Sequence, residues 1–243
     1  MSVLSKNNIV EAIEEKKLVF EPGLDQFQLQ PIAVDLRVGT NFFIPRLSEL
    51  TSEGRAKLNI DHLDDSNKSE ILEQIHLEPG QIFELLPGEF VLISSLEKIS
   101  INSGDIFANL YSRSSTSRRG ILIESGVIEP YFSGHLTIPV FNQTRTHTIK
   151  IYPGERIAQL IFHELKTSIT KEESLSHGLN RPKYQGSKSY MLDYKFDPHD
   201  EIQIIKNGEM EKLKKKFGLK LVEEEVSEEK AVPKIRKRRT KSS

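Results

Sequence analysis

Short runs of strand-forming residues, separated by proline–glycine pairs, recur through the middle of this chain and constrain its fold more than any other feature. The clearest runs are residues 81–85, 90–93, 106–111 and 136–141. Proline presets the first turn dihedral and glycine takes the positive one, so the pairs at residues 79–80, 87–88 and 153–154 favour type II turns. Many short strands with such turns, and no helices alternating with them, predict a mainly β fold of the sandwich, jelly-roll or barrel type.

The N-terminal part of the chain has a different pattern. Ser5 can cap a short helix that carries Ile9 and Ile13 at helical spacing. Residues 32–38 then alternate like a half-buried strand, which we expect to stop at Gly39.

Composition along the chain predicts one domain with two polar additions. We expect the domain to cover residues 1–197, with a polar surface insertion at 44–77, and a charged, flexible tail at 198–243. Residues 209–220 can form a charged helix, but the residues after it are too polar to build a core. The dense basic run at 234–241 favours a solvated tail, with contact to nucleic acid or another polyanion as the alternative.

Overall composition excludes several classes of protein. The net charge of the 243 residues is -1, from 34 basic and 35 acidic side chains, so there is no general attraction to nucleic acid or anionic membranes. Without cysteine there is no disulfide, thiolate metal site or cysteine nucleophile, and the histidines show no metal-ligand spacing. The N-terminus lacks the apolar core of a signal peptide, and no run approaches membrane-spanning length, which predicts a soluble cytoplasmic protein.

The segment at residues 111–120 is the most informative for chemistry. It follows a strand and places three arginines among small hydroxyl residues. Arginine offers a rigid donor fork to phosphate oxygens, and hydroxyls and backbone amides fill the gaps between them. Such a loop suits a triphosphate better than a single carboxylate, although taken alone it is also typical of an ordinary solvated loop.

A hairpin-like segment follows at residues 126–134, with one carboxylate, two aromatic residues and bounding glycines. A hairpin can present backbone donors and acceptors to the edge of a base, and an aromatic ring can lie against a deoxyribose. Glu129 can then polarise a water molecule. Taken alone, this pattern is also typical of an ordinary turn with a surface glutamate.

Five segments, taken in order, resemble the motifs of the dUTPase and dCTP deaminase superfamily. They are residues 30–39, 113–115, 126–130, 153–162 and 183–187. The resemblance is closer to the deaminase-like branch than to ordinary trimeric dUTPases. Within that branch, archaeal-type dUTP diphosphatases are similar in the lead-in at residues 29–31 and the arm at 184–187. The resemblance implies a dUTPase-like distorted jelly roll, or β-clip, with a short N-terminal helix.

The resemblance also implies the composition of the site. It implies a homotrimer with active sites at subunit interfaces, and Mg²⁺ carried by the substrate triphosphate. It assigns water activation to Glu129, and structural or site-supporting roles to Asp35 and Arg156. The implied substrate-binding residues are Ser112, Arg113, Ser114, Ser115, Arg118, Val127, Ile128, Phe132, Gln159, Lys183, Tyr184 and Gln185.

Two reactions fit this superfamily, and position 139 distinguishes them. Deaminating cytosine needs a group that moves protons beside C4, and the deaminases are similar in placing a glutamate five residues beyond the glycine that matches Gly134. Here that position is Pro139, which has no proton to move and no backbone donor. Losing a general acid or base typically costs about 10²–10⁴-fold in rate. We therefore expect hydrolysis of dUTP to dUMP and pyrophosphate, with deamination of dCTP to dUTP and ammonia as the alternative.

A third hypothesis comes from departures from the family pattern. Glu129 stands where the family carries an aspartate, and it adds one methylene. Together with Pro139 and the basic tail, this substitution leaves open a catalytically inactive relative that binds a nucleotide as a regulator. If Glu129 is not the base, Glu124 and Asp35 are the next carboxylates to test.

Overall fold

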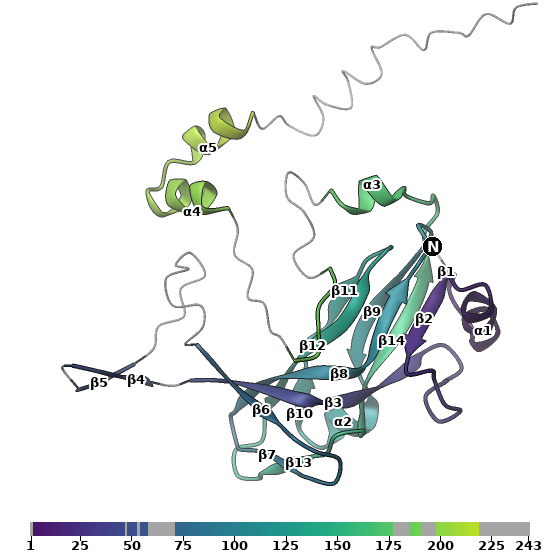
Figure 1. Cartoon of the computed structure of the whole chain (residues 1–243), viewed down its shortest axis with the longest axis horizontal. Coiled ribbons are helices and arrows are strands. Elements are labelled where there is room, and N and C mark those ends of the chain that lie inside the picture. The colour runs from purple at the N-terminus through teal and green to yellow at the C-terminus, as the bar shows by residue number, and fades with distance from the viewer. Residues whose placement is uncertain are drawn as a thin grey trace, which may run out of the picture. The chain divides into compact units, whose positions relative to one another are not determined.

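Strands dominate the part of the chain that the computed structural model describes, which is residues 2–46, 48–52, 54–57, 71–176, 185–190 and 198–218. The chain divides into two units: one contains β1 to β14 and α1 to α3, and the other contains α4 and α5 (Figure 1). The helices are α1 (Lys6–Glu14), α2 (Ser114–Arg118), α3 (Lys171–Ser174), α4 (His199–Lys206) and α5 (Met210–Phe217). The strands are β1 (Ser2–Val3), β2 (Leu18–Glu21), β3 (Val34–Pro45), β4 (Ser48–Thr51), β5 (Gly54–Lys57), β6 (Leu72–His76), β7 (Phe83–Leu85), β8 (Phe90–Ile101), β9 (Ile106–Ser112), β10 (Ile121–Ile123), β11 (Gly126–Ile128), β12 (Ser133–Asn142), β13 (Ile149–Ile151) and β14 (Arg156–Glu164). The mainly β class predicted from the turns and short runs is confirmed.

One curled antiparallel sheet forms most of the first unit (Figure 1). Its strands follow the order β10–β12–β8–β3–β14–β9–β11, with β1 added to β14, β2 to β8 and β6 to β3. Two small sheets pair β7 with β13 and β4 with β5. The long strand β3 joins the two halves of the sheet, because it pairs with β8 on one side and β14 on the other.

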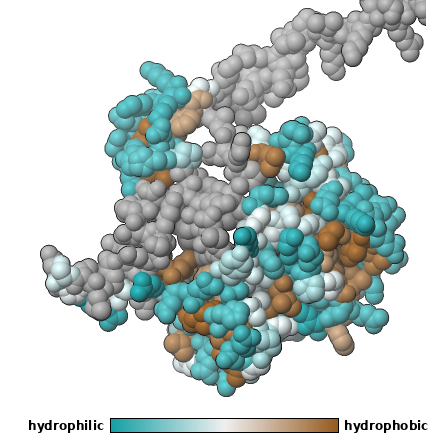
Figure 2. Space-filling view, viewed as in Figure 1, coloured by the Kyte–Doolittle hydropathy of each residue, from teal (hydrophilic) through white to brown (hydrophobic). Residues whose placement is uncertain are grey.

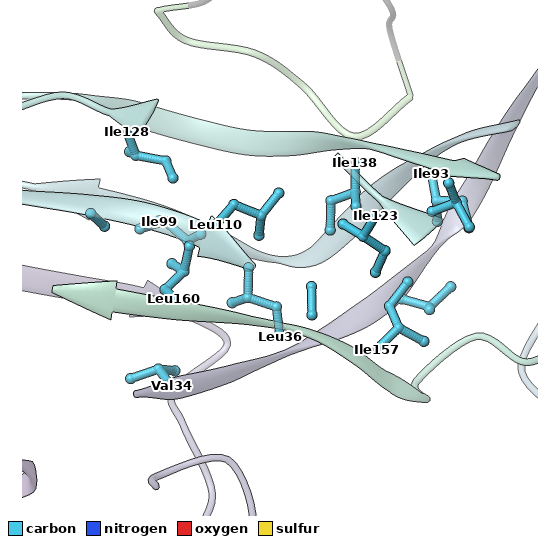
Figure 3. Close-up of a cluster of buried hydrophobic side chains, with 14 of the residues drawn as sticks. Val34, Leu36, Ile93, Ile99, Leu110, Ile123, Ile128, Ile138, Ile157 and Leu160 are labelled. Atoms are coloured by element: carbon cyan, nitrogen blue, oxygen red, sulfur yellow. The ribbon is translucent and has the colours of Figure 1, made fainter. Parts of the chain in front are cut away.

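The core lies inside this curl. Side chains from β3, β8, β9, β12 and β14 point into the space between the strands (Figure 3). Alternate residues of β9 face inward, as expected for a strand with one buried face. Phe162 meets Phe20 edge to face with 6.2 Å between ring centroids, and Phe42 stacks on Phe83 at 4.7 Å. Burial of these apolar side chains is the main stabilising contribution to the fold.

Gly39 does not end a strand, contrary to the expectation from sequence. A Cβ atom at this position would lie 2.6 Å from Ser94 Oγ and 2.8 Å from the Ser94 carbonyl oxygen. Glycine therefore lets β3 pass close to β8, and β3 continues to Pro45. The register between the two strands shifts in this region, between Val38 and Phe42.

Two local predictions are confirmed. Ser5 caps α1, since its Oγ accepts a hydrogen bond from the backbone of Asn8, whose side chain accepts one from the backbone of Ser5. The glycines of the three proline–glycine pairs all have positive φ values, between 73° and 92°. Local turn chemistry and capping thus correctly indicated where the chain reverses and where its first helix begins.

The polar additions contain more regular structure than their composition indicated. In the expected insertion, β6 pairs with β3 and so extends the sheet. In the second unit, α4 precedes the expected charged helix α5, and Lys216 Nζ lies 2.6 Å from Asp200 Oδ2. The predicted domain boundary at residues 197 and 198 stays a prediction.

The surface of the first unit is mixed in character. Figure 2 shows hydrophilic residues over much of the visible face, with hydrophobic residues gathered in patches between them. Phe27 and Val127 are the most exposed of the large apolar side chains, at 71% and 65%. Within the described residues, no helix is both long and apolar enough to span a membrane.

Candidate active site

A loop rich in arginine and hydroxyl groups, residues 112–118, begins where β9 ends. We call it the phosphate loop. Arg113 precedes α2, and its backbone N–H donates to the Ile157 carbonyl with 3.2 Å between N and O. Ser117 Oγ donates to Ser112 Oγ at 2.9 Å, which closes the loop on itself. Ser114, Ser115 and Arg118 are exposed, so their donors face solvent on the outside of the sheet.

Asp35 anchors this loop from the neighbouring part of the sheet. Its carboxylate is buried, and Oδ2 lies 2.9 Å from Arg113 Nε and 3.2 Å from Arg156 Nη1. Arg113 Nη1 also donates to the Arg156 carbonyl oxygen at 2.7 Å. Burial raises the pKa of Asp35, while the two guanidinium groups act in the opposite direction. Gln159 is half-buried on β14, in register with Asp35 on one side and Tyr111 on the other.

Three of the expected substrate-binding residues line one cavity of about 390 Å³, which we call the hairpin cavity. They are Val127, Ile128 and Phe132. Cavities of a few hundred Å³ with mostly apolar walls are typical of small-molecule sites. The opposite wall is formed by β12, including Thr137 and Pro139.

The C-terminal arm covers one end of this cavity. The backbone N–H of His135 donates to the Ser187 carbonyl at 2.9 Å, and the Gly186 N–H donates to the Ser133 carbonyl at 2.7 Å. A Cβ atom on Gly134 would lie 2.9 Å from the Ser187 backbone nitrogen, so the arm lies directly on β12. The Gln185 side chain donates to the Tyr131 carbonyl at 2.9 Å. Lys183 and Tyr184 lie outside the described residues.

Glu129 lies apart from the phosphate loop. It lines a different cavity, of about 380 Å³, together with Phe107 and Glu173. Ile128 pairs with Ala108, which places Glu129 beside residue 107 of β9. Arg113 is six residues further along, or about 20 Å at the usual rise of a strand. One chain therefore does not bring Glu129 and Arg113 to the same triphosphate.

Glu124, which the sequence offered only as a second choice to Glu129, lines the hairpin cavity. Its backbone N–H donates to the Pro139 carbonyl with 3.3 Å between N and O. The pairing of β10 with β12, which sets Ile123 opposite Val140, leads directly into this contact. The sequence does show a carboxylate two residues before the hairpin, but only the strand pairing shows that this residue reaches the cavity.

No three histidine, aspartate or glutamate side chains gather closely enough to hold a metal ion among the residues that the structure describes. The phosphate loop offers hydroxyl and guanidinium groups instead. Guanidinium groups do not bind Mg²⁺, whereas guanidinium and hydroxyl groups both donate hydrogen bonds to phosphate oxygens.

Comparisons with known proteins identify relatives over most of the first unit. Residues 3–165 match a family model described as dCTP deaminase-like. The chain is 39% identical over 166 residues to the dCTP deaminase, dUMP-forming, of Dictyoglomus turgidum, covering 67% of this chain and 80% of that one. It is 31% identical to the dCTP deaminase, dUMP-forming, of Methanobrevibacter smithii, covering 69% and 82%.

A solved structure supports the fold. The crystal structure of 2'-deoxycytidine 5'-triphosphate deaminase from Agrobacterium tumefaciens matches with a TM-score of 0.51 at 23% identity. The match covers 71% of this chain and 51% of that chain. The fold expected from the resemblance, a dUTPase-like curled β structure with a short N-terminal helix, is confirmed.

The preference for dUTP hydrolysis over deamination is wrong. The relatives are named dCTP deaminase, dUMP-forming, which favours the alternative of dCTP deamination, although the product in their names is dUMP and not the dUTP of that alternative. A carboxylate for deamination was expected only at the strand position that Pro139 occupies. In the structure Glu124, from the preceding segment, lines the same cavity as Pro139.

Proposed function

Because this chain belongs to the dCTP deaminase-like family, we propose that it converts dCTP to dUMP. The conversion has two hydrolytic parts. Water replaces the amino group at C4 of cytosine and ammonia leaves. A second water attacks the α-phosphorus, and diphosphate leaves. The observation that carries the proposal is the match over residues 3–165 to this family, with relatives named for that product.

The hairpin cavity is the proposed base site. Its lining is largely apolar, with the backbone of β11 at one side and Thr137 on β12 at the other. Backbone groups can fix the edge of a pyrimidine, and the ring of Phe132 can lie against the deoxyribose. Excluding water from such a cavity strengthens the hydrogen bonds that orient the base.

The phosphate loop is the proposed site for the triphosphate. Asp35 holds Arg113 through Nε, so the guanidinium plane has a fixed direction before substrate binds. An arginine held in this way loses less freedom when it binds phosphate oxygens. Exposed hydroxyls of Ser114 and Ser115, and the guanidinium of Arg118, supply further donors. The Mg²⁺ ion would arrive with the triphosphate and neutralise part of its charge.

The separation of Glu129 from Arg113 supports a site shared between two copies of the chain. A general base and the phosphate ligands must reach one substrate at the same time. With about 20 Å between them along β9, the two side chains meet that condition only if they come from different subunits. The homotrimer implied by the family resemblance provides such an arrangement, and we propose Glu129 as the group that orients the water for diphosphate release.

Separation of nucleotide products tests the proposal. Purified protein is incubated with dCTP and Mg²⁺, and the nucleotides are separated by ion-exchange chromatography. dUMP is the expected product. Accumulation of dUTP would mean that the chain deaminates without releasing diphosphate. Recovery of dCTP alone would overturn the proposed function.

A further inference from the structure

Two titratable side chains line the hairpin cavity within the described part of the chain, and they are Glu124 and His135. The deamination step proposed above needs a group that takes a proton from water and delivers one to the amino group. Pro139 stands on the strand where the family resemblance implies a glutamate for deamination, and a proline can do neither. Within one chain, these two residues are therefore the candidates for this role if the cavity binds the base.

Strand pairing places Glu124 beside Pro139. Ile123 of β10 stands opposite Val140, and Glu124 follows with its N–H bonded to the Pro139 carbonyl at 3.3 Å. The side chain of Glu124 thus starts at the level of Pro139 and lines the same cavity. It is exposed, so its carboxylate can reposition when a ligand enters.

His135 lies elsewhere in the cavity. It is four residues before Pro139 on β12, or about 13 Å at the usual rise of a strand. Its Nδ1 lies 3.1 Å from the Ser95 carbonyl oxygen, so the ring is held toward β8. Its backbone N–H is bonded to Ser187 of the arm. These contacts give His135 a role in seating the arm rather than one beside Pro139.

We infer that Glu124 is the general acid and base of deamination, acting from the segment before the hairpin in place of the missing strand glutamate. This inference rests on the proposed function. Water adds across the C4–N3 bond: its oxygen bonds to C4, and Glu124 passes one proton to N3. Glu124 then takes the proton of the new hydroxyl and gives it to N4. The C4–N4 bond breaks, ammonia leaves, and the base is uracil.

The test compares Glu124→Gln with wild-type protein in an assay of ammonia released from dCTP. The glutamine keeps the size and polarity of the side chain but cannot exchange protons, so ammonia release should fall at least about 10²-fold. Binding of a dUTP analogue with an imido bridge between the α- and β-phosphorus, which carries the already deaminated base and cannot lose diphosphate, is measured by titration calorimetry with Mg²⁺ and should stay within about threefold. Glu84→Gln is the matched control, because Glu84 is exposed on β7, outside this cavity, and pairs with Lys150 at 3.8 Å.

Each outcome decides a separate question. If the wild-type protein releases ammonia and the Glu124→Gln variant releases it at nearly the same rate, the inference is overturned and the proposed function stands. Loss of both ammonia release and analogue binding would show that Glu124 is a ligand of the base, which also overturns the inference. A wild-type protein that releases no ammonia from dCTP would remove the proposed function itself, and the inference with it.

Discussion

Arg113 Nε and the buried carboxylate of Asp35 form an ion pair at 2.9 Å, which joins the phosphate loop to the middle of the sheet. Arg156 shares the same oxygen at 3.2 Å. Because Asp35 is only 1% exposed, removing its charge leaves two cations without their buried partner. The contact therefore couples the stability of the fold to the position of a proposed substrate ligand.

Asp35→Asn should lower both stability and substrate affinity. Breaking a buried ion pair costs several kcal/mol, but Arg113 and Arg156 are about one quarter exposed, so solvent reduces the loss to roughly 1–3 kcal/mol. The free energy of unfolding in urea measures this change, and KM for dCTP should rise because Arg113 loses its orientation. Glu84→Gln, which breaks an exposed pair, is the control. An Asp35→Asn protein with unchanged stability and KM would contradict the anchoring role.

Glu129→Gln should separate the two parts of the proposed reaction. The variant keeps the hairpin cavity, so ammonia release from dCTP should stay within about threefold. Diphosphate release should fall at least about 10²-fold, since a glutamine cannot accept a proton from water. Chromatography should then show dUTP in place of dUMP. Formation of dUMP at the wild-type rate would exclude Glu129 as the water-orienting group.

Mixing two inactive variants tests whether the site is shared between subunits. Glu129→Gln and Arg118→Ala remove groups that, by our account, different subunits contribute to one site. After joint unfolding and refolding at equal amounts, about one quarter of the interface sites should carry both native residues, on random assembly of a symmetric oligomer. Diphosphate release should return to that fraction of wild type. No recovery in a mixture that forms oligomers of native size would show that both groups act within one chain.

Glu97 makes the stability of the fold depend on pH. Its buried carboxylate accepts hydrogen bonds from Gln28 Nε2 at 2.7 Å and from the Arg37 backbone N–H at 3.1 Å. Burial raises the pKa of Glu97 in the folded chain. A raised pKa means that its contribution is fully present below the unfolded value of about 4.3 and is lost as pH rises through the folded value. In urea titrations, the unfolding free energy of the wild-type protein should therefore decrease relative to that of Glu97→Gln as pH rises from 4 to 7. A shift in the opposite direction would contradict the assigned direction of the pKa.

Structural features that depend only on residues close together in the sequence could be predicted. The proline–glycine turns, the Ser5 cap and the strand runs are local signals, and each is confirmed. The path of β3 beyond Gly39 was missed, because the close approach of Ser94 is a contact between residues 55 positions apart. A glycine in a strand pattern can mark the end of the strand or a point where a neighbouring strand approaches closely. Only the position of that neighbouring strand distinguishes the two cases.

The candidate site also combines features that follow from local sequence with features that depend on long-range strand pairing. The residues of the phosphate loop and hairpin were proposed as site residues from their chemistry and order, and this stays a prediction, but their relative positions could not be predicted. Glu129 and Arg113 are 16 residues apart in sequence, yet they lie on different parts of the sheet because β9 and β11 run antiparallel. From the sequence Glu124 was only a second choice to Glu129, because its place beside Pro139 depends on the pairing of β10 with β12.

The most direct test of the central claim follows ammonia, diphosphate and nucleotide together during turnover of dCTP by the wild-type protein with Mg²⁺ present. If the chain converts dCTP to dUMP, ammonia and diphosphate should appear in equal amounts, and each should match the dCTP consumed. Diphosphate without ammonia, with dCMP as the nucleotide, would contradict the account, and so would a complete absence of ammonia.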